Sequence, residues 1–241
     1  MKIAIMQPYF LPYIGYLSLI KHTDQFILFD TVQFIRHGWI ERNRILKQNE
    51  GWLYIQVPLI KNNSRETLIK DCLIDNNQQW KKKVLAQIQP YKKIAPNYFK
   101  VVQLLNIVFD NDYSNISSLN KALLEEICTY LGFPKVLPIF SEMNLEIDEP
   151  KEADEWALNI CKAIKNEMNI NIHYINPIGG LEFFDRKKYS SNDIEISFQK
   201  MQISEYNQKR TPFEAGLSIL DVLMFNSVEE VNLMLDQYEL V

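Results

Sequence analysis

Two arginines in the first fifth of the chain, Arg42 and Arg44, have the spacing of an anion-binding site. Guanidinium groups form paired hydrogen bonds with phosphate or carboxylate. On a strand, residues two apart lie on the same face, so both guanidinium groups would point the same way. Trp39 and Asn43 belong to the same stretch, and an indole ring can stack on a nucleotide base or a sugar.

The neighbouring residues can extend this site or neutralise it. Asp30 and Gln33 precede the stretch, and Glu41 comes directly before Arg42. The alternative to an anion site is a solvated surface in which Asp30 and Glu41 form ion pairs with the arginines. We favour the anion site, because Arg42 and Arg44 stand between apolar residues rather than in a polar run.

A second candidate is the proline- and tyrosine-rich loop that follows the first apolar run. Its candidate residues are Gln7, Tyr9, Tyr13, Gly15 and Tyr16, with Pro8 and Pro12 among them. In open α/β sheets, ligands bind in the crevice at the carboxyl ends of the strands, where this loop would lie. Gly15 would permit close approach of the backbone to a ligand. A buried aromatic corner explains the same residues, so both interpretations stay open.

Two further groups have weaker patterns. Gly179 and Gly180 follow an apolar run and can expose backbone N–H groups to an anion, although an ordinary turn explains them more simply. Tyr206 and Gln208 can bind sugar hydroxyls, although a polar loop is the simpler explanation. Asp221 stands in an apolar segment, where a carboxylate must be paired or lie at the rim of a helix.

No nucleophile or metal site is evident from the spacing of reactive residues. The histidines and cysteines are isolated from one another: His22, His37, His173, Cys72, Cys128 and Cys161. None has the spacing of a metal site, a triad or a disulfide framework. The phosphate-binding and hydrolase patterns based on glycine-rich loops are also missing. We therefore expect no metal ion.

The elements that must position these residues begin with a strand at 3–6, a helix at 17–21 and a strand at 25–29. This order is a βαβ unit, so the two strands should be parallel. The loop at 7–12 and Asp30 would then lie at the same edge of a sheet. Further strands are expected at 52–57, 68–74, 136–140, 171–175 and 194–198, and further helices at 77–90, 95–108, 117–131, 152–165, 216–225 and 229–235.

We predict an α/β protein with a Rossmann-like parallel-sheet part at 1–112. A mixed, more helical part at 113–241 would close the same site, and one single domain is the alternative. A hydrophobic fraction of 47% is ample for a core, and a net charge of −4 argues against a nucleic-acid binder. The sequence shows neither a signal peptide nor a long apolar run, so we expect a cytoplasmic protein without membrane insertion.

Four stretches resemble the WbqC-like protein family: IMQPYFLPYIGYLSLI, FDTVQFIRHGWIERNRIL, YINPIGGLEFFD and EYNQKRTPFEAGLSILDVLMFNS. The residues that match the family pattern are Gln7, Pro8, Tyr9, Pro12, Gly15, Tyr16, Asp30, Gln33, Trp39, Arg42, Asn43, Arg44, Gly179, Gly180, Tyr206, Gln208, Ser218 and Asp221. Thr31 and Glu41 depart from it, since the family has a second aspartate and more often asparagine at these positions.

The resemblance implies a transferase of O-antigen-type surface-glycan biosynthesis. Such an enzyme would transfer an acyl or aminoacyl group to the amine of a nucleotide-linked amino sugar. Asp30 would act as general base, with Tyr9 and Gln7 beside it. No cofactor is firmly implied; the donor would be a coenzyme A ester or another activated acyl group. A homodimer is one option for the assembly.

Tyr13-Ile14-Gly15-Tyr16 also resembles the HxGH turn of nucleotidyl-transferring α/β enzymes such as pantothenate synthetase. Tyrosines replace both histidines here, and a tyrosine is neutral at pH 7. The fold likeness is therefore stronger than the likeness to ATP chemistry. Two alternatives stay open: an ATP-dependent amide-forming or nucleotidyl-transferring enzyme, and a non-catalytic module that binds sugar nucleotides.

Overall fold

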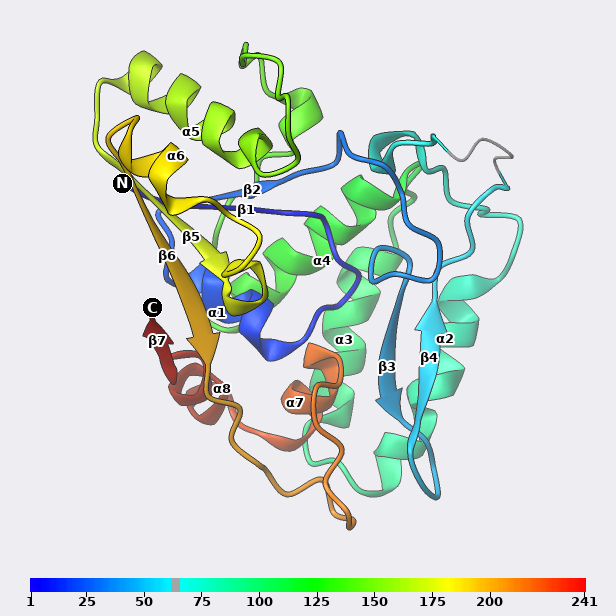
Figure 1. Cartoon of the computed structure of the whole chain (residues 1–241). Coiled ribbons are helices and arrows are strands. Elements are labelled where there is room, and N and C mark those ends of the chain that lie inside the picture. The colour runs from blue at the N-terminus through cyan, green and yellow to red at the C-terminus, as the bar shows by residue number, and fades with distance from the viewer. Residues whose placement is uncertain (62–65) are drawn as a thin grey trace.

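The computed structural model describes residues 1–61 and 66–241 and is built around a five-stranded sheet (Figure 1). The strands have the order β2-β1-β5-β6-β7. All neighbours are parallel except β6 and β7, and the predicted parallel pairing of the first two strands is confirmed. The strands are β1 (Lys2–Met6), β2 (Gln25–Leu28), β5 (Ile172–Pro177), β6 (Ile194–Met201) and β7 (Tyr238–Leu240).

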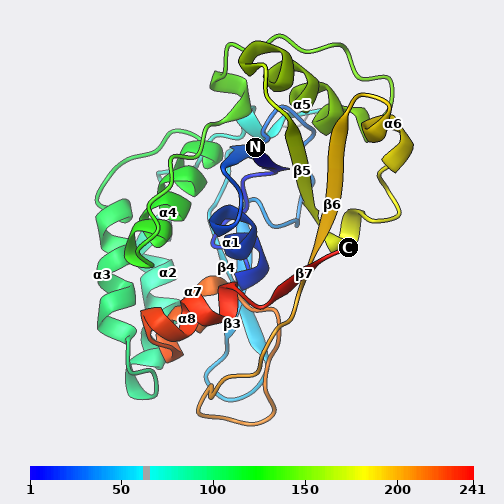
Figure 2. The ribbon, with the colours of Figure 1, turned by 90° about the vertical axis from the view of Figure 1, so that its left-hand side faces the viewer.

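Helices cover both faces of this sheet (Figure 2). Ile3 and Ile5 of β1 pack into one core with helix α5 (Glu155–Met168), whereas Ala4 packs into the core that contains α1 (Ile14–Lys21). This alternation follows from the strand geometry, in which successive side chains point to opposite faces. Helices α4 (Ile116–Tyr130) and α8 (Val228–Leu235) join the α1 side, and α6 (Arg186–Ser190) contacts β6.

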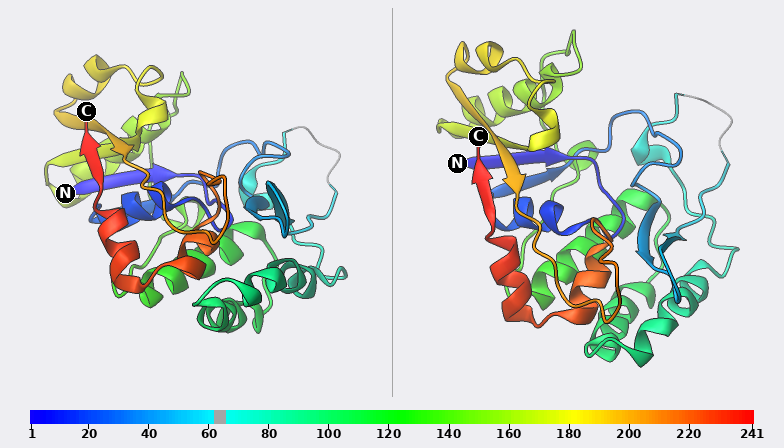
Figure 3. Two further views of the ribbon diagram at one scale, coloured as in Figure 1. Left: turned by 90° about the horizontal axis from the view of Figure 1, so that it is seen from below. Right: turned by 60° about the horizontal axis from the view of Figure 1, so that its bottom comes forward.

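An antiparallel hairpin stands apart from the sheet (Figure 3). Its strands are β3 (Arg42–Leu46) and β4 (Trp52–Gln56). Helix α2 (Trp80–Ile88) contacts β4, and α7 (Ile219–Phe225) contacts β3 and α3 (Tyr98–Phe109). The register opposes Arg42 to Gln56 and Arg44 to Tyr54. Opposed residues point to the same face, so the predicted common direction of the two arginines is confirmed.

Two predicted strands are wrong. Residues 68–74 contain the short helix η1 (Ile69–Asp71) and only isolated bridges to three separate neighbours, which prevents a continuous ladder. Residues 136–140 make one bridge, between Ile139 and Leu28, before the short helix η3 (Phe140–Glu142) begins. Pro138 has no N–H to donate to a ladder. Strand β7 was not predicted, because three residues are too few to show an alternating pattern.

The connections reverse the direction of the strand order between β1 and β5. The chain passes from β1 to β2 on one side and returns through β5 and β6 on the other, which makes β1 and β5 the switch point of the sheet. These two neighbours come from the ranges 1–112 and 113–241. The division into two parts stays a prediction. In the part of the chain that the structure describes, no helix is both long and apolar enough to span a membrane.

Candidate functional site

Hydrogen bonds tie the loop after β1 to the hairpin. The Phe10 N–H donates to the Trp39 carbonyl at 2.8 Å, and the Asn43 amide donates to the Phe10 carbonyl at 3.0 Å. From α4, the buried Asn120 amide donates to the Pro8 carbonyl at 2.7 Å. The strand-end loop is thus held in one position, as a preorganised site requires.

The same loop is also joined to the start of α7. The Ser218 hydroxyl donates to the Leu11 carbonyl at 2.7 Å, and the Ile219 N–H donates to the Pro12 carbonyl at 2.7 Å. The Ser218 N–H donates to the Arg44 carbonyl at 2.8 Å. Ser218 caps α7, so one residue fixes the helix, the loop and the hairpin together.

The three tyrosines of the loop differ in burial. Tyr16 is buried, donates its hydroxyl to the Gln7 carbonyl at 2.8 Å and packs against the Tyr9 ring. Tyr9 and Tyr13 are half-buried. A Cβ atom at Gly15 would lie 2.4 Å from the Tyr13 ring, so Gly15 makes room for that ring. Burial raises the pKa of all three phenols above 10, which leaves them neutral at pH 7.

Asp30 lies just beyond β2, at the same edge of the sheet as this loop, and is buried. Ser141 hydrogen-bonds both of its carboxylate oxygens, through its backbone N–H at 3.1 Å and its hydroxyl at 2.7 Å. In this arrangement Asp30 holds the η3 turn against the end of β2. Its catalytic role stays a prediction, as do those of Gln7 and Tyr9.

Arg44 lies between two indole rings. Its guanidinium carbon is 5.5 Å from the centre of the Trp39 ring and 5.2 Å from that of Trp52. One guanidinium nitrogen donates to the Gly216 carbonyl at 3.0 Å. Trp39 and Trp52 are 38% and 40% exposed, so part of each side chain is open to solvent.

Arg42 is held in a similar way, with its guanidinium 4.0 Å from the centre of the Tyr54 ring. It also donates to the carbonyls of His37 and Gly38. Within residues 1–61 and 66–241, neither arginine forms an ion pair, so the predicted pairing with Asp30 or Glu41 is not seen. We call the surface formed by Trp39, Arg42, Arg44, Trp52 and Tyr54 the arginine–aromatic face.

A cleft of about 690 Å³ lies beyond Gln56, at the Arg42 end of this face. Its described lining residues are Gln33, Phe34, Ile35, Arg36, His37, Glu41, Gln56, Leu59, Ile60, Lys61, Thr67, Asp71 and Cys72. Ligand pockets usually have volumes of about 300–1,000 Å³. We call this hollow the Glu41 cleft. Gln33, a candidate site residue from the sequence, lines it, and its volume is within the usual range for a ligand pocket.

Glu41 is a buried residue in the wall of that cleft, only 4% exposed. One oxygen accepts the His37 N–H at 2.9 Å, whereas the other, Oε2, has no hydrogen-bond partner in the described chain. Burial raises the pKa of Glu41, although the hydrogen bonds and the charge of Arg42 oppose the shift. Cys72 nearby has its pKa raised to about 11, mainly by burial, and stays a neutral thiol at pH 7.

Sequence reasoning missed Glu41 as a site residue and treated it only as a counter-ion and a departure from the family pattern. A glutamate beside an arginine looks like half of a surface ion pair. Its burial depends on the segment that carries Cys72, which lies far along the chain. The one signal in the sequence was that the WbqC-like family more often has asparagine at the position of Glu41.

Tyr206 and Gln208 converge on Asp221, which is completely buried. Tyr91 donates its hydroxyl to one carboxylate oxygen at 2.6 Å, and the Tyr206 hydroxyl and the Gln208 amide, at 2.9 Å, donate to the other. Gln208 also exchanges two hydrogen bonds with the backbone of Glu214. Burial raises the pKa of Asp221. This cluster fastens the loop before α7; sugar binding by Tyr206 and Gln208 stays a prediction.

Gly179 and Gly180 end the short helix η4 (Ile178–Gly180) directly after β5. A Cβ atom at Gly180 would lie 2.1 Å from the Asn176 amide, so this glycine allows close packing. Gly179 is exposed with open space around it. Both lie at the carboxyl end of β5, beside the switch point of the sheet. Their role in binding stays a prediction.

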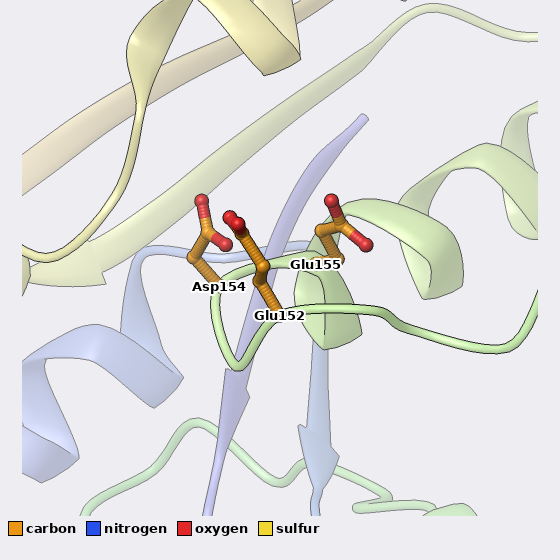
Figure 4. A group of neighbouring side chains, drawn as sticks. All are labelled: Glu152, Asp154 and Glu155. Atoms are coloured by element: carbon orange, nitrogen blue, oxygen red, sulfur yellow. The ribbon is translucent and has the colours of Figure 1, made fainter.

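Three carboxylates near the start of α5 lie together: Glu152, Asp154 and Glu155 (Figure 4). The Lys188 ammonium group from α6 donates to all three, at 2.9 Å in the case of Asp154. A cation of the protein itself therefore satisfies this cluster. It joins α6 to α5 as an ion-pair network.

Comparison with known proteins gives one family and one relative of similar length. Residues 7–233 match the family model described as "WbqC-like protein family". A relative from Mycobacterium tuberculosis (strain ATCC 25618 / H37Rv), named "Uncharacterized protein Rv1507c", is 29% identical over 227 residues, which cover 93% of each chain. No solved structure matches.

Proposed function

Because the chain belongs to the WbqC-like protein family, we propose that it is a transferase of O-antigen-type surface-polysaccharide biosynthesis. It would add an acyl or aminoacyl group to the amine of a nucleotide-linked amino sugar. The pathway and the acceptor class come from the family resemblance. The arginine–aromatic face and the Glu41 cleft support a nucleotide-linked sugar as the substrate.

The observation that carries the proposal is the continuity of the arginine–aromatic face with the Glu41 cleft. Gln56 lines the cleft and is opposed to Arg42 across the hairpin. Arg44 follows on the same face, about 7 Å further along. Guanidinium groups beside half-exposed indoles fit the phosphates and base of a nucleotide, and a cleft of about 690 Å³ fits the attached sugar.

In the proposed reaction the amine nitrogen of the sugar attacks the carbonyl carbon of the donor. The new C–N bond forms as the bond from that carbon to the leaving group breaks, and the amine loses one proton to a base. Asp30 is one candidate base, but Ser141 occupies both of its oxygens. Glu41 fits the role better, because the residue lines the cleft and its buried Oε2 has no hydrogen-bond partner among the described residues.

The likeness to HxGH nucleotidyltransferases supports a Rossmann-like assignment of the sheet and an ATP-dependent enzyme as a second candidate. The residues of the Tyr13–Tyr16 turn argue against the ATP-dependent enzyme. Burial keeps Tyr13 and Tyr16 neutral, and Tyr16 is committed to the Gln7 carbonyl. Neither residue can supply the positive charge that the histidines of that turn provide.

The proposal is tested by incubating the protein with nucleotide-linked amino sugars and a panel of coenzyme A thioesters and other acyl or aminoacyl donors. Mass spectrometry should detect the acylated sugar nucleotide. Arg44→Gln should reduce the yield about 100-fold, because a charge-assisted contact to phosphate is worth about 1.5–3 kcal/mol and Arg44 also orients both indoles. The exposed α2 variant Lys82→Gln is the control.

Binding of a sugar nucleotide without any product across the whole panel would contradict the transferase and favour a non-catalytic binding module. Product formation that requires ATP and releases pyrophosphate would favour the second candidate. Equal activity of the Arg44→Gln and Lys82→Gln variants would remove the arginine–aromatic face from the site.

A further inference from the structure

A second hollow, of about 260 Å³, lies at the opposite end of the hairpin from the Glu41 cleft. It is bounded by the β3–β4 turn, by the short helix η2 (Gln89–Lys93) and by the loop before α7. Figure 1 shows these segments at the bottom of the molecule, where the orange loop approaches the turn. The lining residues are Leu46, Lys47, Gln48, Asn49, Pro90, Tyr91, Lys93, Ile94, Lys209 and Arg210. We call this hollow the basic pocket.

The charged residues that line the basic pocket are all cations. Lys47, Lys93 and Lys209 are exposed, and among residues 1–61 and 66–241 none of them forms an ion pair. Arg210 is paired with Glu214 at 3.4 Å. Three uncompensated ammonium groups around one hollow repel one another and attract an anion.

Arg210 holds two walls of the basic pocket together. Its guanidinium donates to the carbonyls of Lys47, at 2.9 Å, and Gly51, at 2.7 Å, and so fixes the hairpin turn against the loop before α7. Its side chain is only 14% exposed. Lys209, next to it, has a φ of 55°, a left-handed conformation that is uncommon for a residue with a side chain. The Asn207 side chain stabilises it by accepting the Lys209 N–H at 2.9 Å.

The basic pocket and the Glu41 cleft are reached from the same face of the hairpin. Leu46 lines the pocket, Gln56 lines the cleft, and the register places Leu46 on the face that carries Arg42 and Arg44. Four residues of strand separate the two ends, which corresponds to about 14 Å. A donor anchored in the basic pocket could therefore extend along the hairpin toward the Glu41 cleft.

We propose that the basic pocket binds the phosphate or diphosphate group of the second substrate, the activated acyl donor. The assignment to the donor rests on the proposed function. A hollow of about 260 Å³ is suited to a phosphate group rather than to a whole sugar nucleotide. The amides of Gln48 and Asn49 add neutral donors to the three ammonium groups.

Isothermal titration calorimetry with inorganic pyrophosphate tests the site without any turnover. The double variant Lys93→Gln/Lys209→Gln removes two exposed pocket cations, and Lys82→Gln/Lys83→Gln removes two exposed cations from α2, with the same change in net charge. We expect the pocket variant to bind pyrophosphate at least about tenfold more weakly and the control to change less than about twofold. Equal weakening in both variants, or no binding by the wild type, would overturn the proposal.

Two further ligands identify the source of the phosphate group. The pocket variant should weaken binding of a coenzyme A thioester, which represents a phosphorylated donor, and leave binding of a UDP-linked amino sugar unchanged. The reverse pattern would overturn the assignment to the donor. Pyrophosphate binding that depends on the pocket, without any acylated product in the transfer assay, would support the anion site and contradict the proposed function.

Discussion

Two buried carboxyl groups near the hairpin, Asp221 and Glu41, have opposite hydrogen-bond environments. They are 0% and 4% exposed, and burial raises the pKa of both. Asp221 accepts hydrogen bonds from three side chains. Glu41 accepts the His37 N–H on one oxygen, and its other oxygen has no partner in the described residues.

The difference separates a structural role from a chemical one. A buried carboxylate with a full set of hydrogen-bond donors stabilises the segments that it joins. Asp221 joins α7 to η2 and to the loop before α7. An unsatisfied buried oxygen costs free energy that folding alone does not require. We interpret Asp221 as a clamp that keeps the hairpin and loops in place, and Glu41 as the group that exchanges a proton in the cleft.

The largest expected effect is on stability, at Asp221. Asp221→Ala should lower the free energy of unfolding by about 3 kcal/mol or more, because Tyr91, Tyr206 and Gln208 lose their acceptor. Urea unfolding followed by circular dichroism measures it. The exposed Asp110→Ala is the control and should change stability by less than about 0.5 kcal/mol. A loss below about 1 kcal/mol at Asp221 would contradict its role as a clamp.

Removing one of the three donors should have a smaller effect. Tyr206→Phe keeps the ring and deletes the hydroxyl that Asp221 accepts, so we expect a loss of about 1–2 kcal/mol in the same unfolding experiment. Tyr113→Phe is the matched control, because Tyr113 is a half-buried residue whose hydroxyl makes no hydrogen bond in the described chain. Equal stability of the two variants would show that the Tyr206 bond contributes nothing.

Glu41→Gln should change how the stability of the protein depends on pH. Between the ordinary Glu value of 4.5 and the raised pKa of Glu41, the folded protein keeps a proton that the unfolded chain releases. Wild-type stability therefore falls as pH rises through this window, and the variant lacks this fall. Relative to the wild type, Glu41→Gln should be more stable at pH 8 than at pH 4. A difference that is the same at both pH values would contradict the raised pKa; the exposed Glu50→Gln supplies the control.

The smallest effect concerns the Cys72 thiol. The charge of Glu41 contributes to raising the pKa of Cys72 to about 11, so Glu41→Gln should lower it and speed alkylation by iodoacetamide at pH 9 about two- to threefold. Peptide mass spectrometry follows each cysteine separately. Cys128 and Cys161 are internal controls with unchanged rates. An unchanged rate at Cys72 would mean that the Glu41 charge does not reach the thiol.

The sequence sufficed for local features and failed for those that join distant segments. Apolar runs around α1 predicted the parallel βαβ unit, and the spacing of Arg42 and Arg44 predicted their common face. The contact between Ser141 and Asp30 spans 111 residues, and that between Tyr91 and Asp221 spans 130. No spacing rule predicts such contacts. The sequence predicted that Asp221 must be paired or lie at a helix rim, but not that its partners are Tyr91, Tyr206 and Gln208.

We propose that acyl transfer occurs in the Glu41 cleft with Glu41 as the base. Mass spectrometry of a nucleotide-linked amino sugar, incubated with the donor panel and wild-type, Glu41→Gln or Asp30→Asn protein, tests it most directly. We predict acylated product with the wild type and about 100-fold less with Glu41→Gln, which should stay folded under the assay conditions. A Glu41→Gln variant with full activity, or activity lost only in a folded Asp30→Asn variant, would contradict the claim.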